Sequence, residues 1–327
     1  MPTFLPRRLL APLAFSALAL PAMAQRVWKP GRDVEIVVGT DPGTGFDRTA
    51  RVLQAVWKAS GLVTAPVTVL NKPGGAGVIG YHFVNERARF ADELAIIAPL
   101  LLTNNLTGST DFSWHDLTPL CVLLGEEIVT AANPNAHLAT GREFVDALKR
   151  DPASVSVAMS GIGGQNHVTL GLIGKAAGVD ISKLKVVGFT GSGDAVTAVL
   201  GGHVDVVVGP ASSIAGLIEA KRLVGLGIAS EARLGGALAA LPTWQEQGIA
   251  VTFTNWRGVA GPKSMSPQQI AYWDGVFGKT AQLKMWKDEL TRSQLSDHYL
   301  DAAATSAFLA QQEATLRPIL KQLGFAQ

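Results

Sequence analysis

Apolar and polar positions follow a repeating order along the chain: an apolar run, a glycine-rich polar segment, and then apolar positions spaced as on one helix face. The first copy occupies residues 34–58. Val34–Val38 is apolar and β-branched, which is typical of a buried strand. Gly39–Gly45 contains three glycines and a proline, which predicts a loop. Asp47 suits the N-cap or first turn of a following helix, so this copy predicts a strand, a loop and a helix.

This order recurs through most of the chain. We predict further strands at residues 66–70, 94–99, 120–130, 155–159, 185–189, 204–208 and 224–229, and an extended segment at 251–259. We predict helices at residues 78–87, 140–151, 167–177, 194–200, 241–248, 267–279, 281–291 and 305–323, and a loop at 104–116. Because strands and helices alternate, the predicted fold class is α/β, with a mostly parallel sheet in each compact unit.

The glycine-rich loops form two clusters, one before and one after Gly125, which predicts two lobes. A length of 327 residues also suits two compact units. We expect residues 25–124 and 231–327 to form the first lobe and residues 125–230 to form the second. The chain would then cross between the lobes near 125–130 and 224–230, and the two crossings would act as a hinge.

The N-terminal segment has the three parts of an export signal. Arg7 belongs to a basic region, residues 9–20 are apolar but too short to span a bilayer comfortably, and an Ala-x-Ala site ends at Ala24. We therefore predict a cleaved signal peptide over residues 1–24, a mature chain that begins at Gln25, and a periplasmic location. A membrane anchor is the alternative, and the adjacent arginines leave both Sec and twin-arginine export open.

Charge and cysteine content narrow the function classes. Without the two arginines of the signal peptide, 26 basic residues face 26 acidic ones, so nothing indicates a nucleic-acid or anionic-membrane partner. Cys121 is the single cysteine, lies in an apolar run, and is predicted to be buried. An exported chain without an intramolecular disulfide suits a bacterial periplasm, because a large core can hold it together.

No catalytic or metal motif is complete. Gly75–Gly80 matches the dinucleotide fingerprint, but Asp92 and Glu93 precede the next strand, whereas the ribose-binding acid should end it. An NAD-dependent oxidoreductase that uses these glycines is therefore the alternative of the enzyme class. Ser192 lacks the nucleophile-elbow glycine because position 190 is Thr190, and the six histidines lack metal-ligand spacing. We predict a protein that is not an enzyme, with no cofactor and no metal.

Four glycine-rich loops, at 39–47, 71–77, 160–167 and 190–194, each precede a predicted helix. Backbone N–H groups at helix N-termini attract anions, and loops that follow parallel strands share one edge of a sheet. The loops therefore favour an anionic ligand, although each could be only a tight turn, and His167 could either contact the ligand or cap its helix. The candidate ligand-binding residues are Thr40, Asp41, Gly43, Thr44, Gly45, Phe46, Asp47, Asn71, Gly77, Ser160, Gly161, Ile162, Gly163, Gly164, Gln165, Asn166, His167, Thr190, Gly191 and Ser192.

Several segments resemble one known family in sequence, order and spacing. They are PGTGFD at 42–47, NKPGGAG at 71–77, SGIGGQNH at 160–167, the run 186–208, LPTWQEQG at 241–248 and WRGVAGP at 256–262. In these the chain resembles the Bug family, the periplasmic receptors of tripartite tricarboxylate transporters. The resemblance implies a two-lobed Venus-flytrap fold, similar to type II periplasmic binding proteins, with two crossovers.

The resemblance also implies a ligand and partners. The ligand would be a small carboxylate, a di- or tricarboxylate or a similar compound, held largely by backbone amides and water. The partners would be the large and small permease subunits of a tripartite transporter, and we expect a monomer. A receptor that signals to a sensor kinase is equally compatible with the sequence.

Two positions depart from the family pattern in the first loop. Thr44 stands where a glycine is usual, and Asp41 stands where a small or apolar residue is usual. A carboxylate close to an anion pocket is unfavourable, because like charges repel by about 1 kcal/mol even in water at short range. We therefore expect Asp41 to face the solvent or to meet an amino group of the ligand.

Overall fold

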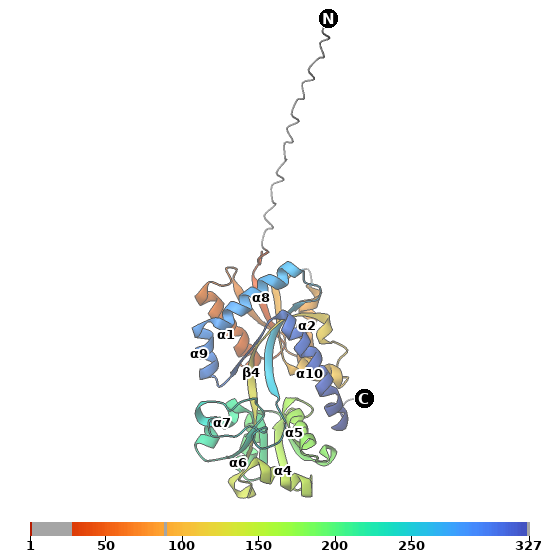
Figure 1. Ribbon diagram of the computed structural model, residues 1–327, viewed down its shortest axis with the longest axis vertical. Coiled ribbons are helices and arrows are strands. Elements are labelled where there is room, and N and C mark those ends of the chain that lie inside the picture. The colour runs from red at the N-terminus through yellow and green to blue at the C-terminus, as the bar shows by residue number, and fades with distance from the viewer. Residues whose placement is uncertain (2–27, 88–89, 326–327) are drawn as a thin grey trace.

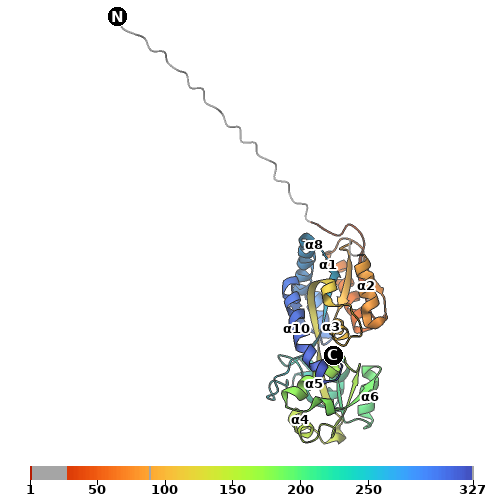
Figure 2. The same cartoon turned by 90° about the vertical axis from the view of Figure 1, so that its right-hand side faces the viewer.

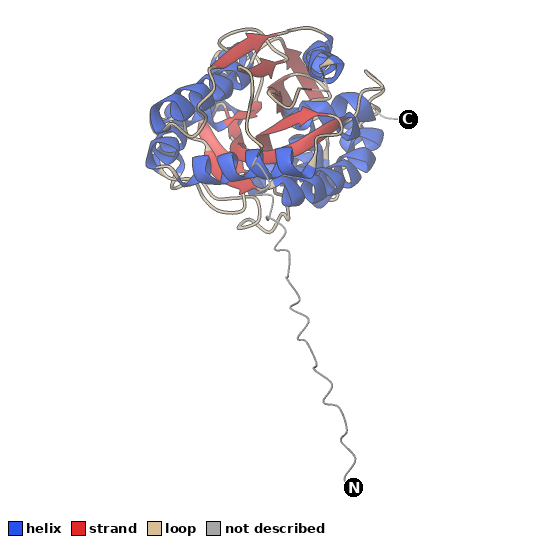
Figure 3. Cartoon of the chain, turned by 90° about the horizontal axis from the view of Figure 1, so that it is seen from above, coloured by secondary structure: helices blue, strands red, loops and turns tan. Residues whose placement is uncertain are grey.

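The chain folds into two lobes that lie one above the other, joined by long strands (Figure 1). The structure, a computed structural model, describes Met1 and residues 28–87 and 90–325. The predicted signal peptide, residues 1–24, lies almost entirely outside these residues. Viewed from above, strands run through the middle of the molecule to one edge, and helices flank them on both sides (Figure 3). The two-lobed α/β fold is thus as predicted.

Lobe 1, the upper part of Figure 1, is built on the strand order β2-β1-β3-β9-β4, and β10 also pairs with β4. β1 pairs in parallel with β2 and β3, whereas β9 is antiparallel to β3 and β4. Its strands are β1 (Val34–Val38), β2 (Val67–Asn71), β3 (Glu93–Ile97), β4 (Leu117–Ala132), β9 (Thr254–Pro262) and β10 (Ser296–Leu300). Its helices are α1 (Gly45–Ser60), α2 (Val78–Glu86), α3 (Pro99–Leu106), α8 (Pro267–Gln282), α9 (Lys284–Arg292) and α10 (Ala302–Gln322).

Lobe 2 is built on the order β4-β7-β5-β6, and β8 also pairs with β4. β5 is parallel to β6 and β7, whereas β4 is antiparallel to β7 and β8. Its strands are β5 (Ser156–Ser160), β6 (Lys185–Phe189), β7 (Val206–Pro210) and β8 (Val224–Ile228). Its helices are α4 (Gly141–Arg150), α5 (Gln165–Ala176), α6 (Ser192–Leu200) and α7 (Ala211–Glu219).

β4 is the element that joins the lobes. We predicted an apolar run that Gly125, Glu126 and Glu127 interrupt, but Leu117–Ala132 is one continuous strand. Its first part pairs with β9 in lobe 1, and its last residues pair with β7 and β8 in lobe 2. The prediction of mostly parallel sheets is also corrected, because the long crossing strands add antiparallel pairs and make each sheet mixed.

The packing of the segment after β8 indicates where the chain crosses between the lobes a second time. Leu241, Trp244 and Ile249 are buried in the cores of lobe 2, whereas Phe253 belongs to a core of lobe 1. We therefore propose that the chain returns to lobe 1 near residues 252–254, so that 231–251 belongs with lobe 2. The predicted helix at 241–248 is wrong, because these residues form turns.

Other differences from the predicted elements have local causes. The loop predicted at 104–116 begins as the end of α3, whose polar residues such as Thr103 are buried. α7 was missed because Gly209 and Pro210 indicate a turn, yet Pro210 ends β7 and caps the helix. β10 was missed because Ser296–Leu300 is short and largely polar.

Each lobe buries apolar side chains on both faces of its sheet. In lobe 1, α1, α8 and α9 cover one face and α2, α3 and α10 cover the other (Figure 1). In lobe 2, α4 and α5 pack on one face and α6 and α7 on the other. The C-terminal end of α10 lies next to α5, so the lobes touch there (Figure 2). Within the described ranges, no helix has the length and apolar character that a membrane crossing needs.

Candidate functional site

The lobes enclose a cavity of about 330 Å³ beside the crossing strands. The first turns of α1, α5, α6 and α7 contribute to its wall, and so do β4, β9 and α9. The residues preceding those four helices follow strands β1, β5, β6 and β7, so the loops lie at carboxyl ends of strands, where ligands bind in α/β proteins. Cavities of this size hold small-molecule ligands.

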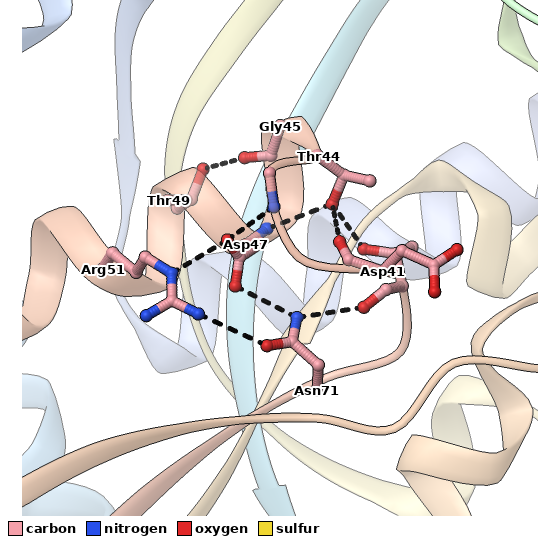
Figure 4. A network of polar contacts seen from close by, with 9 residues as sticks. Asp41, Thr44, Gly45, Asp47, Thr49, Arg51 and Asn71 are labelled. Carbon is pink, nitrogen blue, oxygen red and sulfur yellow. Dashed lines mark hydrogen bonds and ion pairs between the residues drawn. The ribbon is translucent and has the colours of Figure 1, made fainter.

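The first loop is held by Asp47 (Figure 4). Its buried carboxylate accepts hydrogen bonds from the Gly43 N–H at 2.8 Å, from Arg51 Nε at 2.9 Å and from Asn71 Nδ2 at 3.0 Å. The hydrogen bond from Arg51 lowers the pKa of Asp47, with smaller contributions from Gly43 and Asn71. Asp47 is thus a first-turn acid whose contacts tie the loop after β1 to the end of β2, and its side chain does not line the cavity.

Thr44 is the N-cap of α1, the role that we gave to Asp47 as one of two options. Its Oγ1 accepts the Asp47 N–H at 3.4 Å and lies 2.6 Å from Thr40 Oγ1. Oγ1 also donates to the carbonyl of Asp41 at 3.0 Å. Thr40 and Thr44 both line the cavity, whereas Asp41 is exposed and does not.

The loops of lobe 2 bring three polar side chains to the cavity. Ser160 Oγ and Ser192 Oγ lie 3.1 Å apart, at the end of β5 and the start of α6. Asn166 Nδ2 donates to the carbonyl and to Oγ of Ser160, both at 3.2 Å. Gly161 and Gly163 have φ of 68° and 81°, which only glycine adopts without strain, so the tight loop before α5 depends on them.

A buried ion pair that the sequence analysis missed lies on the crossing strands. Arg257 Nη2 of β9 donates to Glu126 Oε2 of β4, and Ser212 Oγ of α7 donates to Glu126 Oε1 at 2.6 Å. The exposed side-chain fractions of Arg257 and Glu126 are only 6% and 10%. The guanidinium lies 5.7 Å from the ring centroid of Phe46. A charged residue inside a long apolar run, as at Glu126, is the signal that could have revealed this pair.

Arg48 is a second missed cation. It lies in the first turn of α1, is exposed, lines the cavity, and has no ion-pair partner in the part of the chain that the structure describes. A cation is unfavourable at a helix N-terminus, and its charge also lowers the pKa of Arg257 to a small extent. Burial is the larger cause of that lowering. A bound anion would relieve both repulsions.

The predicted candidates divide into two groups. Eight of them line the cavity: Thr40, Thr44, Gly45, Phe46, Ser160, Gln165, Asn166 and Ser192. The other twelve do not line it: Asp41, Gly43, Asp47, Asn71, Gly77, Gly161, Ile162, Gly163, Gly164, His167, Thr190 and Gly191. Besides the residues of the ion pair and Arg48, the cavity wall includes residues that we did not predict: Thr49, Val52, Leu124, Pro210, Ser212, Asn255, Trp286, Glu289, Leu290, Ser293 and Leu295.

His167 supports a loop behind the cavity. Its Nδ1 accepts the Gly163 N–H at 3.2 Å, and its ring lies edge-on to Phe325 at 5.1 Å between centroids. Burial lowers its pKa to about 4, so the ring is neutral at pH 7. Of our two interpretations of His167, this arrangement matches the supporting role in the first turn of its helix.

Several cavity-lining side chains have buried polar atoms without a partner. Among the described residues, Asn166 Oδ1, Asn255 Oδ1, Arg257 Nε and Trp286 Nε1 make no hydrogen bond. Buried polar atoms in native proteins are nearly always paired. A ligand or water in the cavity would supply the missing partners.

The glycines of the dinucleotide fingerprint have a packing role. A Cβ on Gly39 would lie 2.6 Å from the Cα of Gly77, so the loops after β1 and β2 touch through their glycines. Neither glycine lines the cavity. Within the described ranges, no group of three or more His, Cys, Asp or Glu residues is arranged to hold a metal ion.

The chain is similar in sequence to proteins of one receptor family. Residues 50–325 match the family model of the tripartite tricarboxylate transporter family receptor. Protein BugT of Bordetella pertussis is 26% identical over 319 residues, which is 95% of each chain.

Solved structures share the fold. A TctC solute binding protein from Polaromonas superimposes with a TM-score of 0.79 and 24% identity, over 90% of this chain and 99% of that one. A protein of R. palustris, solved with adipate, gives a TM-score of 0.74 and 19% identity, over 91% of this chain and 99% of that one.

Proposed function

The chain belongs to the tripartite tricarboxylate transporter receptor family, and we propose that it captures a small carboxylate between its lobes and delivers it to the membrane subunits of such a transporter. The family assignment confirms the resemblance inferred from the sequence. Members are periplasmic solute-binding receptors, which agrees with the export signal expected at residues 1–24. What we propose for this chain is the carboxylate ligand, its delivery to the membrane, and the permease subunits as partners.

The observation that carries the proposal is the convergence of four helix N-termini on one cavity. Residues in the first turns of α1, α5, α6 and α7 all line it. Each N-terminus presents unpaired backbone N–H groups and the positive end of a helix dipole. Charge-assisted hydrogen bonds contribute about 1.5–3 kcal/mol each, so three or four could support a micromolar dissociation constant, which requires about 8 kcal/mol.

The side-chain charges favour the same ligand. Glu126 neutralises Arg257, so the pair adds little net charge to the cavity. Arg48 keeps an uncompensated positive charge within the described chain, beside the first turn of α1. An anion at this end of the cavity would meet Arg48 and the helix N-termini together. That the R. palustris relative was solved with adipate supports a carboxylate for this chain too.

The proposal can be tested by calorimetric titration of a panel of carboxylates into the mature protein. We expect at least one to bind, and its carboxamide analogue to bind much more weakly because the amide has no negative charge. Arg48→Gln should weaken carboxylate binding, whereas Lys58→Gln, which removes the same charge from the last turn of α1, should not. If no carboxylate binds while NAD does, the oxidoreductase that we considered would replace this proposal.

A further inference from the structure

The cavity has two chemically different ends. At one end lie the helix N-termini, Arg48 and the polar side chains of lobe 2. The other end belongs to lobe 1, and five apolar side chains form its wall: Val52, Leu124, Trp286, Leu290 and Leu295. All five belong to one hydrophobic core of lobe 1 or pack against it. The cavity therefore reaches from the interface of the lobes to core side chains.

Buried side chains form the wall of the apolar end, which extends along α1. Leu124, Trp286 and Leu290 are 2%, 1% and 3% exposed, so the wall consists of core side chains. Along α1, Val52 lies seven residues beyond Gly45, which is about 10 Å at 1.5 Å per residue. This distance accommodates a benzene ring or a chain of several methylene groups next to a carboxylate.

The polar groups at the apolar end disfavour a second negative charge. Glu289 lines the cavity there, and its carboxylate accepts from Ser293 Oγ at 2.8 Å and pairs with exposed Arg292. The indole N–H of Trp286, unpaired in the described part of the chain, is a single neutral donor that suits a carbonyl or hydroxyl oxygen. Because Arg292 already pairs with Glu289, a carboxylate placed there would lose its hydration to a mainly apolar wall and find a neutral donor in exchange, which is costly.

From this asymmetry we infer that the ligand is a monocarboxylate with an apolar body, aromatic or aliphatic, and that di- and tricarboxylates bind poorly. The inference rests on the proposed function, because it assigns the carboxylate to the helix N-termini. The body then lies against α1 and α9, where its burial contributes to affinity in proportion to the apolar area removed from water. Val52, Leu290 and Trp286 become the residues that determine specificity.

Two matched pairs of ligands test the inference by calorimetry. 4-Methylbenzoate and terephthalate differ only in a methyl group against a second carboxylate, and hexanoate and adipate differ in the same way. We expect the monocarboxylate of at least one pair to bind about tenfold or more tightly than its dicarboxylate, a difference of about 1.4 kcal/mol. 4-Methylbenzamide, which has the apolar body but no charge, should bind much more weakly than 4-methylbenzoate.

A charge placed at the apolar end provides a second test. Val52 is half-buried and lines the cavity, so Val52→Lys should supply a partner for a distal carboxylate and raise terephthalate affinity relative to 4-methylbenzoate. Ala55→Lys adds the same charge to α1 at an exposed position outside the cavity and should leave the ratio unchanged. If Val52→Lys does not fold, the affinities of the wild-type protein for the two matched pairs alone decide whether the inference holds.

The outcomes separate this inference from the proposed function. If in both pairs the dicarboxylate binds as tightly as its matched monocarboxylate or more tightly, the inference is wrong and the receptor function stands. The inference is also wrong, and the receptor function stands, if only small polar acids such as malate bind. The conclusion is the same if Val52→Lys folds and leaves the ratio of terephthalate to 4-methylbenzoate affinity unchanged. If no carboxylate binds at all, the proposed function fails and the inference falls with it.

Discussion

The buried ion pair of Arg257 and Glu126 is expected to affect the stability of the fold strongly. The pair joins β9 to β4 at the crossing, and Ser212 links it to α7 in lobe 2. Removal of one buried partner leaves the other charge without compensation, which typically costs about 3–5 kcal/mol. Replacement of both partners avoids that penalty.

We therefore expect Arg257→Met to lower the free energy of unfolding by about 3–5 kcal/mol, measured by urea denaturation. The double variant Arg257→Met with Glu126→Gln should recover part of the loss, because the amide carries no charge. Equal stability of the single and double variants would show that Glu126 is not left as an unpaired buried charge.

His167 makes stability depend on pH in a defined window. Its pKa is about 4 in the folded chain and about 6.5 in an unfolded one. Above pH 6.5 neither state is protonated, and between 6.5 and 4 the unfolded state alone takes up the proton. Stability from this group is therefore lost as the pH falls through that window, by up to about 1.4 kcal/mol per pH unit.

The variant His167→Gln should remove this dependence. Carboxylates also titrate below pH 6, so the measurement is the difference between wild type and variant in unfolding free energy at several pH values. We expect the stability of the wild type relative to the variant to fall between pH 6.5 and 4 and to be constant above 7. A difference that does not change with pH would contradict the buried, neutral histidine.

At the scale of elements, the first loop depends on Asp47. Asn in its place keeps one acceptor oxygen but turns an NH₂ group toward donors such as the Gly43 N–H or Asn71 Nδ2. We expect Asp47→Asn to lower the unfolding free energy by about 1–3 kcal/mol and to weaken carboxylate binding, because Thr44 and Gly45 shift. Asp288→Asn, which breaks an exposed pair with Lys284, should change stability by less than about 1 kcal/mol.

Glycine spacing and apolar runs predicted most strands and helices, and the loops that precede α1, α5 and α6. The pattern could not show which loop residues turn inward. Asn71 supports Asp47 from β2 and does not line the cavity, and within the loop 160–167 the glycines lie away from the cavity whereas Ser160 lines it. α9 could not be assigned to the site, because only the tertiary packing brings Trp286 and Leu290 to the cavity.

At the scale of the whole molecule, β4 and β9 run side by side through the region between the lobes, from the pair Gly125–Trp256 to the pair Glu127–Thr254. Bending of a few residues at such crossings lets lobes close around a ligand. We expect X-ray scattering of the protein with a saturating carboxylate to give a smaller radius of gyration than without it. The matched carboxamide should leave the curve unchanged, and identical curves with and without the carboxylate would argue against hinge closure.

The location of the bound ligand is the most direct test of the central claim, that a carboxylate binds between the lobes at converging helix N-termini. A crystal structure of the protein with a carboxylate selected by titration would show it. We expect carboxylate oxygens within about 2.7–3.1 Å of backbone N–H groups in the first turns of α1, α5 or α6, near Arg48. Density for the ligand only outside this cavity, for example in the hollow beside Leu100 and Gly163, would contradict the account.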